Sequence, residues 1–93
     1  MILLIIHMNY ILECGTGIDT ASYQKSLYAV TVDLAVSEAQ NTVGAGTDQL
    51  ISIENITGSN FDDVIKGNSD SNILSGSGGN DLLYGQGGDD ILF

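Results

Sequence analysis

The sequence predicts an all-β β-solenoid, in which nine-residue units coil into two small parallel sheets and carry an inserted strand-and-loop segment. Three observations predict this fold. Five nine-residue units follow one another up to Phe93. No segment combines helical periodicity with plausible capping residues. The chain also has 12 Gly and no Pro, so its turns must depend on Gly, Asn, Asp and Ser.

The charge and composition of the chain limit its partners. Two Lys/Arg stand against 12 Asp/Glu, a formal net charge of -10, which disfavours nucleic acid and anionic membrane surfaces as partners. The 43% hydrophobic content argues against disorder, although the net charge is high. A single cysteine, Cys14, excludes an internal disulfide and a cysteine-based zinc site within one chain. A hard cation is therefore the expected partner for so many carboxylates.

Residues 1–14 form an apolar N-terminal segment. Its unbroken apolar run, Met1 to Ile6, is far shorter than the ~20 residues needed for a membrane span, and it lacks the basic region of a signal peptide. We expect a buried edge strand or upstream sequence here, with a structural role for His7. The stretch "NYILEC" also resembles a degenerate repeat, with Tyr10 in the place of an Asp.

Residues 15–57 form a repeat-flanking segment with an inserted strand and loop. Asp19 and Asp48 fit the pattern G-x-G-x-D locally, but neither has an obvious partner turn. The stretch 28–36 alternates with period two, which predicts a half-buried strand. Its inward-facing residues would be Val30, Val32, Leu34 and Val36. The polar, glycine-containing stretch 37–48 predicts a loop.

Residues 58–93 hold the four most regular units, and 49–57 is a weaker fifth. Each unit has a turn-forming first half and an apolar second half, and Gly is first in four of the five. The sixth positions are Glu54, Asp63, Asn72, Asp81 and Asp90. We expect Glu54 to be solvated or to act as a cap. The eighth positions, which should form the core, are Ile56, Ile65, Leu74, Leu83 and Leu92.

The spacing decides which polar side chains meet. A turn and a short strand reverse the chain in each unit, so units two apart share an edge. Parallel strands lie about 4.8 Å apart, and carboxylates at that spacing repel one another unless they are protonated or bridged by a cation. Carboxylate and carbonyl oxygens favour Ca²⁺ over Mg²⁺ and over softer metals. The candidate metal ligands are Asp63 with Asp81, Asn72 with Asp90, and the turn residues Gly76, Gly78, Gly85 and Gly87 through backbone carbonyls.

These units resemble the RTX, or hemolysin-type, calcium-binding repeat G-G-x-G-x-D-x-U-x. The resemblance implies a parallel β-roll with Ca²⁺ held in its turns, folding outside a bacterium after secretion. The chain departs from the pattern in several places. Ser77 and Gln86 replace the second glycine, Asn72 replaces an acid, and Phe61 and Asp70 replace the fourth glycine. Phe61 is poorly suited to a positive φ, so a reshaped turn is expected there.

No H-E-x-x-H, G-x-S-x-G or P-loop motif is found, so a non-enzymatic calcium-binding module is expected. Because the repeats stop mid-array, we interpret the chain as a part or fragment of a secreted RTX-type protein. Other repeats of a longer parent chain, or stacking of the chain on itself, are possible partners. Three alternatives stay open: an adhesive or structural segment of a surface protein, favoured by an exposed apolar patch on 23–48; the repeat tail of a secreted protease or lipase lacking its catalytic domain; and a non-functional reading frame.

Overall fold

The computed structural model describes residues 3–5, 11–13, 17–44 and 46–93, and these form strands and turns without a helix. All of the strands are short. In chain order they are β1 (Leu3–Ile5), β2 (Ile11–Glu13), β3 (Thr20–Ser22), β4 (Thr31–Asp33), β5 (Gln40–Asn41), β6 (Thr47–Ile51), β7 (Asn55–Thr57), β8 (Val64–Lys66), β9 (Ile73–Ser75), β10 (Leu82–Tyr84) and β11 (Ile91–Leu92).

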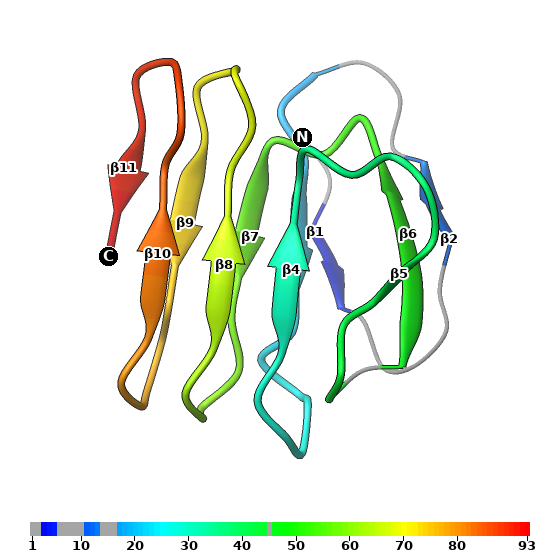
Figure 1. Cartoon of the computed structure of the whole chain (residues 1–93), viewed down its shortest axis with the longest axis vertical. Coiled ribbons are helices and arrows are strands. Elements are labelled where there is room, and N and C mark those ends of the chain that lie inside the picture. Colours follow the sequence, from blue (N-terminus) through cyan, green and yellow to red (C-terminus); the bar gives the residue numbers. More distant parts are fainter. Residues whose placement is uncertain (1–2, 6–10, 14–16, 45) are drawn as a thin grey trace.

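The strands build a parallel β-roll, as the nine-residue spacing predicted. One sheet has the order β1-β3-β7-β9-β11, a second has the order β10-β8-β4, and a third has β2-β6-β5 (Figure 1). In the repeats, parallel partners lie one coil apart: Val64 pairs with Leu82, and Ile73 pairs with Ile91. Successive units therefore alternate between two sheets, and each pair of units completes one coil.

The core follows from the alternation of side chains within these three-residue strands. The middle residue of a strand points to the opposite face from its neighbours, so the eighth residue of a unit faces the space between the sheets. Ile56, Ile65 and Leu74 are buried there, and Leu83 packs partly buried against them. Leu92 is half-exposed, because β11 is the outermost strand of its sheet.

Two edges of turns connect the sheets of the repeat region. We call residues 58–63 and 76–81 the lower edge, and residues 67–72 and 85–90 the upper edge, as they lie in Figure 1. The chain passes from one edge to the other with each strand. Consecutive units therefore present their sixth residues at opposite edges, and every second unit lies on the same edge.

The inserted segment differs from its prediction in two respects. The strand within 28–36 ends at Asp33, whose Oδ1 accepts a hydrogen bond from the Ala35 N–H. This turn directs the chain away, so Val36 is exposed, although Val30, Val32 and Leu34 are buried as expected. The stretch 37–48 is not simply a loop, because β5 pairs with β6 in antiparallel orientation.

The N-terminal strands extend the roll. β1 lies at one end of the five-stranded sheet and pairs in parallel with β3, while β2 pairs in parallel with β6. His7, Tyr10 and Cys14 lie outside the described residues, so the expectations for them stand as predictions. Within the part of the chain that the structure describes, no helix has the length and apolar character needed to cross a membrane.

Candidate metal centre

The sixth residues of units on one edge are joined by a hydrogen bond of a repeated kind. On the lower edge, the Asp63 N–H donates to Asp81 Oδ1 at 2.8 Å. On the upper edge, the Asn72 N–H donates to Asp90 Oδ1 at 2.9 Å. The sixth side chain of one coil therefore reaches back to the backbone of the preceding coil. This contact places Asp63 beside Asp81, and Asn72 beside Asp90.

Asp63 is the most constrained carboxylate of the lower edge, with an exposed fraction of 1%. Its Oδ1 accepts hydrogen bonds from the Val30 N–H at 2.9 Å and from the Ser59 hydroxyl at 2.6 Å. Its Oδ2 is buried and has no hydrogen-bond partner in the described part of the chain. A buried carboxylate oxygen without a donor is costly unless it is protonated or meets a cation.

The unpartnered oxygen lies over a glycine, together with a carbonyl of the next coil. A Cβ built on Gly58 would lie 2.5 Å from Asp63 Oδ2 and 3.0 Å from the Gly76 carbonyl oxygen. Both of these atoms are hydrogen-bond acceptors, and both lie close to the space that a side chain at position 58 would occupy. The donor set, carboxylate plus backbone carbonyl, fits a hard cation such as Ca²⁺. Among the described residues, no three His, Cys, Asp or Glu side chains gather into a metal-binding group, so carbonyl oxygens would have to supply most ligands.

The electrostatics of the lower edge favour neutralisation of Asp63. Burial raises the pKa of Asp63, and the nearby charge of Asp81 raises it further, while the hydrogen bonds from Ser59 and Val30 oppose the shift without cancelling it. A raised pKa means that this folded arrangement disfavours the charged carboxylate. A bound cation would neutralise the Asp63 carboxylate as a proton does.

The upper edge has the same outline but different chemistry. A Cβ on Gly67 would lie 2.7 Å from the Gly85 carbonyl oxygen and would also meet Asn72 Oδ1. The Asn72 amide, however, already has partners in the chain. Its Nδ2 donates to the Glu54 carbonyl at 2.7 Å, and its Oδ1 accepts from the Asn68 N–H at 2.9 Å.

The turns come in two shapes. In the last two units, the fourth residues Gly79 and Gly88 have φ values of 85° and 81°, and the second residues Ser77 and Gln86 have φ values of 62° and 65°. Phe61, in contrast, is not among the described residues with positive φ. The expected reshaping of the turn at 58–63 is therefore observed, because the Phe side chain strongly disfavours that region.

The remaining glycines named as ligands serve the stacking of turns. A Cβ on Gly78 would lie 3.3 Å from the Asn60 carbonyl oxygen, and a Cβ on Gly87 would lie 3.7 Å from Ser69 Cα. Gly78 and Gly87 thus lie against the turns of the preceding coil. Their role as carbonyl ligands stays a prediction.

Sequence reasoning missed one contact of the same kind further upstream. The Asp19 N–H donates to Glu54 Oε1 at 2.9 Å, because β3 pairs with β7 and sets residue 19 beside residue 54. The expectation that Asp19 lacks a partner turn was therefore wrong. A signal was available: Glu54 occupies the sixth position of its unit, and Asp19 lies two residues after Gly17 in the local pattern G-x-G-x-D.

Asp48 is held in a different environment, inside the inserted segment. Its Oδ2 accepts hydrogen bonds from the Tyr23 hydroxyl and the Thr42 hydroxyl, both at 3.1 Å. All three side chains are buried, and burial, followed by the charge of Asp48 and its hydrogen bond, raises the pKa of Tyr23. These contacts give Asp48 a structural role that explains its burial.

The fold and the site together define a class of protein: a parallel β-roll whose turns carry acidic side chains in register. The family described as RTX calcium-binding nonapeptide repeat (4 copies) matches residues 57–92. Residues 57–92 therefore carry RTX calcium-binding nonapeptide repeats. No curated protein matches the chain.

Replacing the first glycine of the last unit should disturb its carboxylate. In Gly85→Ala the new Cβ would lie 2.5 Å from Asp90 Oδ2, and we expect a loss of about 1–3 kcal/mol in the free energy of unfolding because the side chain must move. Gly87→Ala is the matched control, since its Cβ would make only ordinary contacts, the nearest at 3.7 Å from Ser69 Cα. Urea unfolding measures both. Equal losses in the two variants would contradict the crowding argument.

The raised pKa of Asp63 predicts a pH dependence of the calcium-free protein. The folded state holds a proton on Asp63 more tightly than the unfolded chain does. The associated stability is therefore present in acid and is lost as the pH rises through the folded-state pKa. Asp63→Asn keeps an acceptor for Val30 and Ser59 but cannot ionise, so its urea midpoint should fall less over the same range. Urea midpoints in EGTA from about pH 4 to about pH 7 test this. Parallel curves for the two proteins would refute it.

Proposed function

We propose that this chain is a calcium-binding module whose folding is coupled to Ca²⁺, and that it forms part of a secreted RTX-type protein. One observation carries the proposal. On the lower edge, Asp63 Oδ2 is buried without a hydrogen-bond donor among the described residues, beside a second carboxylate and over a glycine that also meets a backbone carbonyl. The chain thus presents converging oxygens at this edge.

The proposed ligands of the lower edge are Asp63, Asp81 and the carbonyls of Gly76 and Gly78. On the upper edge they are Asn72, Asp90 and the carbonyls of Gly85 and Gly87, and the neutral Asn72 makes this the weaker site. Bound Ca²⁺ would supply the positive charge that these oxygens lack. The protein's contribution is to hold the oxygens together: Asp81 Oδ1 is fixed by the Asp63 N–H, and the first glycines leave room for the second oxygens.

Coupling to folding follows from the small core of the repeat region. Each coil buries only two eighth-position aliphatic side chains, worth about 1.5–3 kcal/mol each, against a backbone entropy cost of about 1–2 kcal/mol per residue. Repulsion between neighbouring carboxylates adds to the cost. Binding to the folded state alone would contribute about 2.7 kcal/mol per site at one hundred times Kd, which is a large share of the stability of a small domain.

The secreted setting is supported by the family and by the chemistry of the site. Extracellular calcium modules work at dissociation constants on the order of 10⁻⁴–10⁻³ M. Such sites stay empty where calcium is scarce and fill outside the cell. A chain with a net charge of -10 would then fold only after export.

Removing one carboxylate of the lower edge should weaken calcium binding. We expect Asp81→Asn to lower the calcium affinity of that edge by at least about tenfold, since affinity depends on the number of charged ligands. Asp89→Asn is the matched control, because Asp89 is exposed and lies outside the proposed ligands. Calorimetric titration with Ca²⁺ and then Mg²⁺ measures the affinity, and circular dichroism in EGTA and in Ca²⁺ measures folding. A β-sheet signal that is unchanged between EGTA and saturating Ca²⁺ would rule out the coupling.

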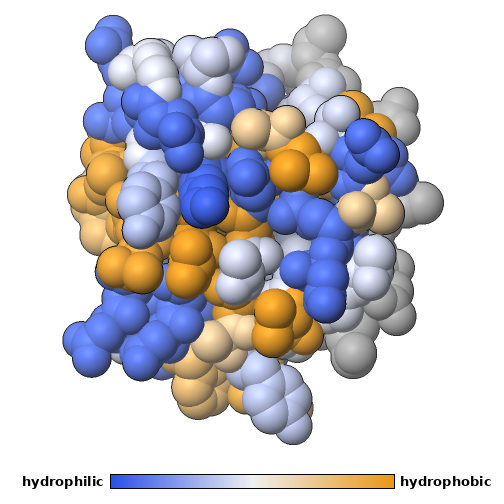
Figure 2. Space-filling view, viewed as in Figure 1, coloured by the Kyte–Doolittle hydropathy of each residue, from blue (hydrophilic) through white to orange (hydrophobic). Residues whose placement is uncertain are grey.

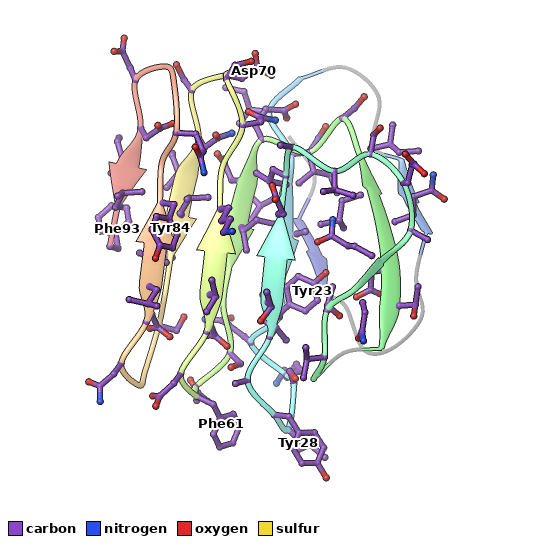
Figure 3. All side chains as sticks on the ribbon, in the orientation of Figure 1. Tyr23, Tyr28, Phe61, Asp70, Tyr84 and Phe93 are labelled. Atoms are coloured by element: carbon purple, nitrogen blue, oxygen red, sulfur yellow. The ribbon has the colours of Figure 1, made fainter. Side chains whose placement is uncertain are left out.

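An adhesive role is the second candidate, because apolar side chains are exposed on the inserted segment. Leu27, Tyr28 and Val43 are exposed by 78%, 68% and 69%. Figure 3 shows Tyr28 and Phe61 pointing away from the lower end of the molecule, whereas Tyr23 points inward. A surface of this kind fits an apolar patch on another protein.

Leu27→Ser with Tyr28→Ser should reduce retention of the chain on a phenyl-substituted matrix and leave the calcium titration unchanged. The loss of apolar surface is the reason for the weaker retention. If the unaltered chain is not retained in the presence of calcium, the adhesive candidate fails and calcium binding alone remains.

A further inference from the structure

On the upper edge both polar atoms of the Asn72 side chain are hydrogen-bonded, whereas on the lower edge Oδ2 of the corresponding Asp63 has no partner among the described residues. We propose that Asn72 is a built-in substitute for a cation, so that the upper edge closes without calcium and the lower edge alone requires it. This inference rests on the proposed calcium-binding function. It adds that the two edges of one roll respond differently to the ion.

The first observation is that both polar atoms of the Asn72 side chain, and its backbone N–H, have hydrogen-bond partners in the chain. Nδ2 donates across to the carbonyl of Glu54 in the preceding coil, and Oδ1 accepts from the Asn68 N–H in its own turn. The backbone N–H donates to Asp90 in the following coil. The residue is 1% exposed, so these bonds are shielded from water. The side chain thus links its own turn to the preceding coil, and the backbone N–H links it to the following coil, without an ion.

The second observation is the contrast with Asp63, at the same position of the preceding unit. Asp63 is equally buried, at 1% exposure, yet one of its carboxylate oxygens has no hydrogen-bond partner within the residues that the structure describes. Where Asn72 directs an N–H group at a backbone carbonyl, a carboxylate would direct an oxygen at it. The Asn72 Nδ2 lies 2.7 Å from the Glu54 carbonyl oxygen, a separation at which two oxygens require a proton or a metal ion between them.

The third observation concerns the charges along each edge. On the lower edge, Asp63 and Asp81 occupy adjacent coils. On the upper edge, the neutral Asn72 lies between Glu54 and Asp90, because β9 lies between β7 and β11. The two acids are then separated by about two strand spacings, roughly 9.6 Å, and their repulsion is weaker. The upper edge therefore lacks the main reason to need a cation.

Asn72→Asp tests the inference, with Ser71→Asp as its control. Both variants add one negative charge to the same turn, but residue 71 is exposed and residue 72 is buried. In EGTA, Asn72→Asp should lower the folding equilibrium constant at least about tenfold relative to Ser71→Asp, because a donor is lost and a buried charge is created. In saturating Ca²⁺ the difference should shrink, and calorimetry should show more calcium bound per chain. Urea unfolding followed by circular dichroism gives the equilibrium constants.

Equal stability of the two variants in EGTA would overturn the inference, and so would an Asn72→Asp chain that Ca²⁺ fails to restore.

The unaltered protein offers a second measurement that needs no variant. In EGTA, the side-chain amide protons of Asn72 should exchange with solvent much more slowly than those of Asn60, which is exposed. Similar exchange rates would overturn the proposal. Failure of the proposed function itself would appear differently, as a calorimetric titration of the unaltered protein without calcium binding.

Discussion

The roll depends on one contact: a sixth-position side-chain oxygen that accepts the backbone N–H of the sixth residue one coil earlier. Asp81 makes this contact with Asp63, and Asp90 makes it with Asn72, in each case across 18 residues. It satisfies a donor at the turn, where the sheet ladder has ended. It also fixes the offset between coils, so the apolar eighth residues align above one another. The repeated polar residue at the sixth position therefore has a structural role that does not depend on metal binding.

The same contact explains why the first residue is glycine in each of the four most regular units. With one oxygen committed to the preceding coil, the second oxygen turns back over the start of its own unit. A Cβ there would collide with it, as the spacing at Gly58 and Gly85 illustrates. The two oxygens of one carboxylate thus have separate tasks. One holds the coils together, and the other is available for a cation.

Repeat spacing predicted the parts of the structure that repeat, because a fixed period translates directly into position. The strands from β7 to β11 fall on the seventh to ninth residues of their units, and Asp63 lies beside Asp81 for the same reason. The inserted segment was harder, since its contacts obey no period. Tyr23 meets Asp48 across 25 residues, and Asp19 meets Glu54 across 35. Nothing in the local sequence of 37–48 indicated that β5 would pair with β6 in antiparallel orientation.

The outer faces of the last two coils show how little of this chain is shielded by packing. In Figure 2, hydrophobic residues cover the middle of the side where β10 and β11 lie, with hydrophilic turns above and below. Leu82, Tyr84 and Ile91 are about half-exposed there. Lys66, 5.7 Å from the centre of the Tyr84 ring, provides a cation–π contact on this face, worth about 0.5–1 kcal/mol at an exposed site.

The alternation of units between two edges limits how such a chain can change length. Deleting the single unit 58–66 would place Asn72 on the opposite edge from Glu54, so its amide would lose the carbonyl to which it donates. Deleting two units would return every side chain to its former row and remove one full turn of the spiral. Insertions and deletions of units that preserve this architecture should therefore come in even numbers. The structural repeat is the pair of units that makes one coil, rather than the single nonapeptide.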